Sequence, residues 1–117
     1  MTAHIIYTAI DPNIVATQSP EAIRFIREEI GFQGLLMSDD LSMKALTGSY
    51  RERAERTLAA GCDAVLHCNG NQDEMVSVVA LAGTLAEDRA EAALSPRKTP
   101  TSVDIAALNE ELNTLLG

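Results

Sequence analysis

The chain has 117 residues, which is enough for one modest domain with its own core and too few for two. Apolar residues make up 46% of it, a share typical of folded proteins, and 17 acidic residues against 9 basic ones give a net charge of −8. That charge repels phosphate backbones, so we expect no nucleic-acid partner. The sequence shows neither a membrane-spanning segment nor a signal pattern, so we expect a soluble cytoplasmic protein with no membrane partner.

The first part of the chain predicts two strands separated by a helix. Residues 4–10 are rich in β-branched side chains, which favour a strand. Ser19 is a natural N-cap, Pro20 fits the first helical position, and Gly31 suits the left-handed residue that ends a helix. Residues 34–38 then form a short apolar run that predicts a second strand.

The second part predicts one more strand and mostly helices. Ser49 and Glu52 have the spacing of a capping box, which predicts a helix that runs to Gly61. Residues 63–68 predict a third strand. The further predicted elements are helices over 72–85 and 86–94, a linker over 95–100, and a final helix after Asp104 with Ile105, Leu108, Leu112 and Leu115 on one face.

Strands that alternate with helices and read as continuous apolar runs indicate a parallel sheet covered by helices, so the fold class is α/β. Three parallel strands alone leave both sheet edges open and enclose little core. We therefore expect either an unusually small α/β domain or a piece of a larger sheet or barrel.

The strongest functional signal is the pair Asp39 and Asp40 at the end of the second predicted strand. A buried strand excludes charged groups from its interior, and ligands bind at the carboxyl ends of parallel strands. From the pattern alone, Asp39 is either a reactive carboxylate or a cap of the following segment. Successive strand side chains point to opposite faces, so we interpret Asp40 as a supporting or capping group.

Several motifs in order resemble one family, the bacterial β-N-acetylhexosaminidases of glycoside hydrolase family 3. The resemblance covers residues 1–71 well and the helical tail loosely. The motifs are His4-Ile5-Ile6-Tyr7, Ser19-Pro20, Arg27-Glu28-Glu29-Ile30-Gly31-Phe32-Gln33-Gly34, Ser38-Asp39-Asp40-Leu41-Ser42-Met43 and Ala59-Ala60-Gly61-Cys62-Asp63-Ala64.

The resemblance implies the C-terminal portion of a (β/α)₈ TIM-type barrel, with residues 1–94 as units six to eight and residues 95–117 as a linker and C-terminal helix. It also implies a retaining exo-β-N-acetylglucosaminidase that removes terminal N-acetylglucosamine, including from muropeptides during cell-wall recycling, without a cofactor. Asp39 matches the nucleophile. Asp40 stands where many relatives carry an aromatic residue.

The family's Lys-His pair, which grips the sugar, and its loop with the acid/base His have no counterpart in this sequence. Met1 matches a position within the sixth strand of the barrel, so the resemblance implies a chain that begins in mid-strand. We therefore expect the isolated chain to be inactive or nearly so.

The two histidines and two cysteines have modest expectations. His4 is either a structural residue or a contact to the sugar or to the surroundings of the nucleophile, and His67 is interpreted as an ordinary strand residue. Cys62 and Cys68 are expected to be small buried apolar residues. We expect no metal site, because no ligand spacing supports one.

Two other function classes fit parts of the pattern. A receiver-type phosphoacceptor module also places an acidic pair at strand ends, but its Lys at a later strand end is missing, since the third predicted strand is followed by Asn69. A non-catalytic remnant could instead self-associate through its open sheet edges and the apolar stripe of the last helix.

Overall fold

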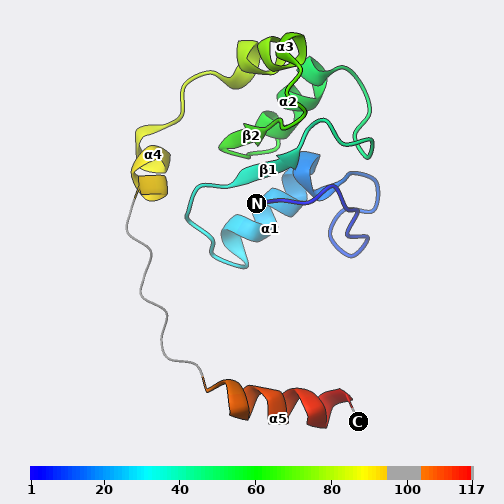
Figure 1. The fold of residues 1–117 in the computed structure, drawn as a ribbon, viewed down its shortest axis with the longest axis vertical. Coiled ribbons are helices and arrows are strands. Elements are labelled where there is room, and N and C mark those ends of the chain that lie inside the picture. Colours follow the sequence, from blue (N-terminus) through cyan, green and yellow to red (C-terminus); the bar gives the residue numbers. More distant parts are fainter. Residues whose placement is uncertain (95–103, 117) are drawn as a thin grey trace.

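The computed structural model describes residues 1–94 and 104–116 (Figure 1). Its sheet has two parallel strands, β1 (Met37–Asp40) and β2 (Ala64–Leu66). The helices are a 3₁₀ turn η1 (Ala16–Gln18), α1 (Pro20–Glu28), α2 (Tyr50–Ala59), α3 (Gln72–Ala82), α4 (Glu87–Leu94) and α5 (Ile105–Leu116). The parallel α/β character is thus confirmed, while the remainder of a barrel stays a proposal.

The helices begin where their capping residues predict. The Ser19 hydroxyl oxygen accepts the Ala22 amide at 3.1 Å and caps α1. At α2, Ser49 and Glu52 form the predicted capping box. Each cap satisfies backbone N–H groups that a helix leaves unpaired in its first turn.

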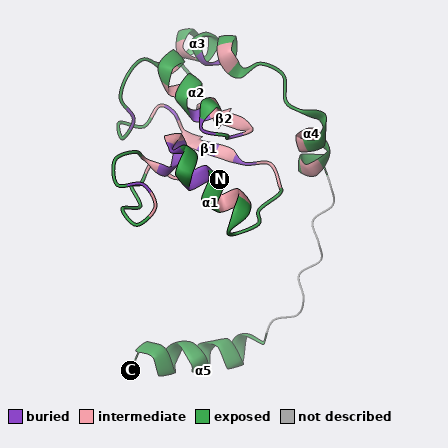
Figure 2. Cartoon of the chain, turned by 180° about the vertical axis from the view of Figure 1, so that it is seen from behind, coloured by how far each residue is buried: buried purple, intermediate pink, exposed green. Residues whose placement is uncertain are grey.

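The core consists of two apolar clusters that hold the helices against the sheet. The buried members of the first are Ile23, Leu36, Ala60 and Cys62, and those of the second are Leu41, Leu46, Ala54 and Val78. Figure 2 shows the buried residues gathered around β1, β2 and the adjoining helices. Because α1, α2 and α3 all contribute side chains to these clusters, β1 packs against helices.

The prediction of a strand over residues 4–10 is wrong. The first residues do lie along β1, since the Thr2 amide donates to the Met37 carbonyl at 2.9 Å. The chain then bonds to its own return segment, where the Ala16 amide donates to the Ile5 carbonyl, and it turns at 8–10. A β-branched run forms a strand only where another strand pairs with it, and among the described residues none does.

The other two strands are shorter than predicted, and β1 is shifted toward the acidic pair. Met37 pairs with Ala64 and Asp40 with Leu66, so three steps along β1 match two along β2. This is a β-bulge, and the Ser38 hydroxyl fills it by accepting the Leu66 amide at 2.9 Å. Asp39 and Asp40 are therefore the last two residues of a bulged strand. The sequence had placed them after the end of a regular strand.

The two thiols differ from each other. Cys62 is buried, as predicted, and burial raises its pKa to about 11, which makes it a poor nucleophile. Cys68 was also predicted to be buried, and this is wrong, because it is exposed in the loop that leaves β2. Both cysteines are free.

At the amino end of the sheet, one carboxylate joins four segments. Asp63 accepts the Leu36 amide at 2.7 Å and pairs with Arg27 of α1 at 2.6 Å. Arg89 of α4 lies 3.5 Å from its other oxygen. Since Asp63 and Arg27 are largely buried, this cluster fixes the starts of β1 and β2 against α1 and α4.

The last helix, α5, lies apart from the other elements in Figure 1, and all its described residues are exposed. The predicted linker at 95–100 lies outside the described residues. Among the residues that the structure describes, no helix is both long and apolar enough to cross a bilayer.

We predict that Asp63→Asn lowers the free energy of unfolding by about 1.5–3 kcal/mol, because it removes a charged acceptor shared by two arginines and a backbone amide. Urea denaturation followed by circular dichroism measures this. Glu28→Gln, an exposed position at the end of α1, is the control and should change it by less than about 0.5 kcal/mol. Equal effects of the two substitutions would contradict the role given to Asp63.

Candidate functional site

The candidate site lies at the carboxyl end of the sheet, where β1 ends in the acidic pair. Asp39 is half-buried, and its Oδ1 accepts the backbone N–H of Asp40 at 2.8 Å. Among the described residues, this local bond is the one hydrogen bond of the Asp39 carboxylate. Its other oxygen is thus left available to a ligand.

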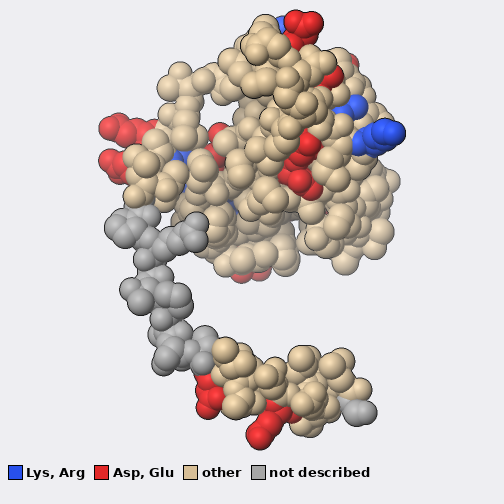
Figure 3. All heavy atoms as spheres, viewed as in Figure 1, with Lys and Arg blue, Asp and Glu red and all other residues tan. Residues whose placement is uncertain are grey.

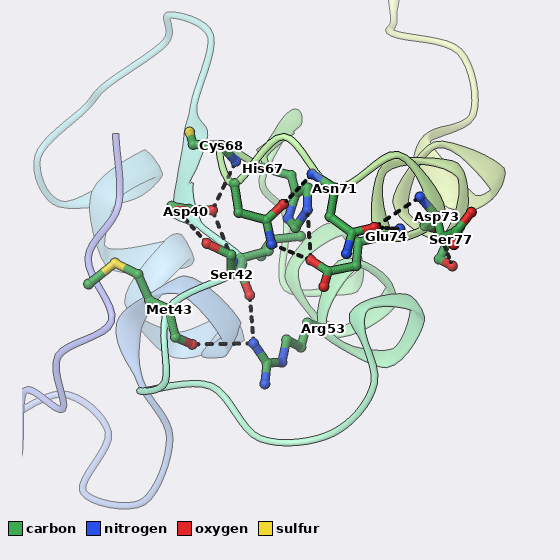
Figure 4. Close-up of polar contacts among 12 residues, drawn as sticks. Asp40, Ser42, Met43, Arg53, His67, Cys68, Asn71, Asp73, Glu74 and Ser77 are labelled. Carbon is green, nitrogen blue, oxygen red and sulfur yellow. Dashed lines mark hydrogen bonds and ion pairs between the residues drawn. The ribbon is translucent and has the colours of Figure 1, made fainter.

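The neighbouring carboxylate, that of Asp40, is fully engaged within the protein. Its Oδ1 accepts the amides of Ser42 at 2.9 Å and Cys68 at 3.2 Å, and its Oδ2 accepts the Ser42 hydroxyl at 2.6 Å (Figure 4). These bonds join the end of β1 to the loop that leaves β2. The two adjacent carboxylates therefore differ in what they can do.

The same contacts set the ionisation of Asp40. Burial raises the pKa of its carboxyl, but the hydrogen bonds from Ser42 and Cys68 and the charge of His67 outweigh burial, so the pKa lies below its ordinary value. A lowered pKa in the folded state means that ionised Asp40 stabilises the fold above its unfolded-state pKa. This contribution is lost as the pH falls through the folded-state pKa.

His4 supports the same strand end through both ring nitrogens. Its Nε2 lies 2.9 Å from the backbone carbonyl of Asp40, and since a carbonyl only accepts, Nε2 carries the proton and donates. Its Nδ1 bonds to the Thr17 hydroxyl at 2.9 Å, and that hydroxyl bonds to the buried Thr2 hydroxyl at 2.9 Å. The structure thus places His4 against the last peptide of β1.

Sequence reasoning missed the role of Arg53 on α2. Its guanidinium donates to the carbonyl of Leu41 at 2.7 Å and, through Nε, to that of Gly48 at 3.0 Å. It also lies 5.0 Å from the centre of the Tyr50 ring. Arg53 therefore fixes the loop that follows the acidic pair, and no local sequence signal reveals such a contact across 12 residues.

Sequence reasoning also missed the setting of His67, which it placed within a strand. His67 follows β2, and its side chain is 5% exposed. The Tyr50 ring meets it edge-on with 5.1 Å between ring centres, and Glu74 Oε2 lies 3.2 Å from its Nε2. The described residues contain no group of three or more His, Cys, Asp or Glu side chains placed to hold a metal ion.

Charge is distributed unevenly over the surface. On the face drawn in Figure 3, acidic side chains are scattered over the described residues, and few basic ones lie among them. Arg51 and Arg56 on α2 are exposed.

Comparison with known proteins identifies the family. Residues 1–96 match the model of the glycosyl hydrolase family 3 N-terminal domain. A protein named Beta-hexosaminidase from Nitrosomonas eutropha is 46% identical over 81 residues, which is 66% of this chain and 23% of that protein. Proteins of the same name from Shewanella frigidimarina and Glaesserella parasuis are 44% identical over 71 residues (59% of this chain) and 41% over 81 residues (68%).

The chain spans about a fifth to a quarter of the length of these curated relatives, with 23%, 21% and 24% of each covered. The family match covers most of the chain and includes the whole of the candidate site. The chain therefore belongs to glycoside hydrolase family 3, whose N-terminal domain it matches, and the relatives reported above are named Beta-hexosaminidase.

Proposed function

We propose that this chain contributes the nucleophile, Asp39, to a retaining exo-β-N-acetylglucosaminidase. The observation that carries the proposal is the division between the two carboxylates. Asp40 is engaged by three hydrogen bonds, whereas Asp39 makes one, to the adjacent amide, among the described residues. A carboxylate that must attack carbon needs a lone pair that no donor occupies.

The chemistry has two steps. An oxygen of Asp39 forms a bond to the anomeric carbon while the bond to the leaving oxygen breaks, and an acid protonates that oxygen. The group that gave up its proton then takes one from water, the water oxygen bonds to the same carbon as the ester bond to Asp39 breaks, and the sugar leaves with its configuration retained. No cofactor takes part in either step.

Asp40 is unsuited to the role of the acid/base partner. That partner must bind and release a proton in each cycle, and the lowered pKa of Asp40 together with its three hydrogen bonds keeps it ionised. Because the register shifts between Met37 and Asp40, strand alternation alone does not separate the two side chains, and the hydrogen bonds carry this argument. We propose that the acid/base group and the sugar-binding residues come from outside these 117 residues.

The relatives named Beta-hexosaminidase support an N-acetylhexosamine as the sugar. We propose terminal N-acetylglucosamine, including that of muropeptides, with the enzyme acting in the cytoplasm. Residues 1–94 would form units six to eight of a (β/α)₈ barrel, with the candidate site at its carboxyl face. His4 and Asp40 would hold the backbone at the end of β1 and so position Asp39. Both ring nitrogens of His4 are bonded within the protein, so His4 would not bind the sugar.

The two alternative classes receive less support. A receiver module would use the acidic pair to hold Mg²⁺, and the Asp40 oxygens are already bonded to Ser42 and Cys68. Self-association through open sheet edges and the exposed face of α5 remains a proposal about the isolated chain.

We predict that the isolated 117-residue chain does not hydrolyse an aryl N-acetylglucosaminide above the rate of a buffer blank. The physical reason is that, on this proposal, the proton donor and the sugar-binding residues lie outside these 117 residues. Release of the aryl alcohol, followed by absorbance, measures this. Turnover that disappears in Asp39→Asn would contradict the inactivity while supporting the nucleophile.

A second prediction concerns a chimera in which this chain replaces the matching segment of the Nitrosomonas eutropha relative. We expect the chimera to hydrolyse the aryl substrate and Asp39→Asn to lower kcat/KM by about 10³-fold or more, because the amide is a far weaker nucleophile. The matched substitution Asp40→Asn should cost only about 10-fold to 100-fold, since it disturbs support and not the reacting atom.

Three outcomes would count against the assignment of Asp39. They are a folded chimera without activity, an Asp39→Asn variant that keeps most of its kcat/KM, and an Asp40→Asn variant that loses as much as Asp39→Asn. Circular dichroism of each variant shows whether the fold is intact.

A further inference from the structure

The loop that leaves β2 contains a buried imidazole whose polar atoms are poorly satisfied. Neither ring nitrogen of His67 has a hydrogen-bond partner among the described residues. Glu74 Oε2 lies 3.2 Å from Nε2, which is an ion-pair distance without hydrogen-bond alignment. Burying an imidazole without hydrogen bonds to its nitrogens costs free energy, and a functional role of His67 would account for that cost.

The charged and titratable groups that face His67 come from every element around it. Glu74 of α3 and the Tyr50 ring of α2 contact His67, and Arg53 of α2 lies over the Tyr50 ring. Figure 4 shows Glu74 beside His67, with Asp40 of β1 near the loop that carries it. Burial raises the pKa of Tyr50, and Glu74 raises it further as a hydrogen-bond partner and by its charge, so Tyr50 stays neutral.

His67 is linked to the candidate site through the next residue in the chain. The Cys68 amide donates to Asp40 Oδ1 at 3.2 Å, and the ring of His67 is fixed between Tyr50 and Glu74. The position of this ring therefore sets where the Cys68 peptide lies. The charge of the ring also acts directly, since it is one of the causes that favour ionised Asp40.

We propose that His67 is a positioning residue for Asp39: its ring, held between Tyr50 and Glu74, keeps the Cys68 peptide against Asp40 at the end of β1. The proposal rests on the proposed function of Asp39. An ionised Asp40 accepts the bonds from Ser42 and Cys68, whereas a protonated one has a donor O–H beside two other donors. In the protonated state the end of β1 loses this support.

The test is an acid titration of the full ¹⁵N,¹³C-labelled chain, from about pH 7 to about pH 2.5, followed by NMR. An imidazole carries its positive charge in the acidic range where carboxylates titrate. In the wild-type chain, the Cys68 amide and the Asp40 carboxyl carbon should titrate together, with a midpoint below the ordinary value of 3.8. Separate titration of these two signals would overturn the proposal.

His67→Phe keeps a ring beside Tyr50 and removes the charge, so the Asp40 midpoint should move to higher pH. His67→Gln also removes the charge and loses the ring contact, so it should raise the midpoint similarly and also increase hydrogen exchange at the Cys68 amide. The control Thr57→Val, at another buried and unpartnered polar atom on α2, should leave both signals unchanged. An unchanged midpoint in the two His67 variants would overturn the proposal.

The chimera tells this proposal apart from that of the nucleophile. His67→Phe should move the acidic limb of its kcat/KM profile to higher pH, a change that a purely structural residue would not produce. If the Asp40 midpoint moves but Asp39→Asn leaves activity intact, the nucleophile assignment fails and the link between His67 and Asp40 stands. If Asp39→Asn abolishes activity and the Asp40 midpoint does not move in the His67 variants, the nucleophile assignment stands and the link between His67 and Asp40 fails.

Discussion

The structure around the acidic pair depends on one carboxylate that accepts three hydrogen bonds. Asp40 receives two backbone amides and one hydroxyl, and in this way it joins the end of β1 to its own following loop and to the loop after β2. With two short strands in the sheet, backbone pairing alone supplies few bonds. Side-chain oxygens complete the ladder at both ends, Asp63 at the amino end and Ser38 and Asp40 toward the carboxyl end.

This arrangement gives two identical residue types different chemistry. Asp40 is surrounded by donors that stabilise its charge and occupy its lone pairs, so it acts as an acceptor that holds the backbone. Asp39 differs by one position in the strand, and its carboxylate is bonded to a single neighbouring amide among the described residues. Environment, more than residue type, decides which of two carboxylates can react.

The sequence predicted what is encoded locally and missed what is encoded at a distance. Ser19 and the Ser49–Glu52 capping box predicted the starts of α1 and α2, because each cap acts within one helical turn. The strand over 4–10 failed since strand formation requires a partner that the local pattern does not supply. The settings of Arg53 and His67 depend on contacts with residues brought close by the fold, which no spacing rule reveals. The acidic pair was found because a charge at the end of an apolar run is itself a local anomaly.

The central claim is that Asp39 forms the covalent bond to the sugar, and locating that bond tests it most directly. The chimera is treated with a fluorinated N-acetylglucosaminyl fluoride, whose good leaving group favours the first step while the ring fluorine slows the second, and the digested protein is read by tandem mass spectrometry. We predict one sugar per chain, attached to the peptide that contains Asp39, and none on the Asp39→Asn variant. A sugar attached to Asp40 or to any other residue, or turnover of the fluoride without any adduct, would contradict the account.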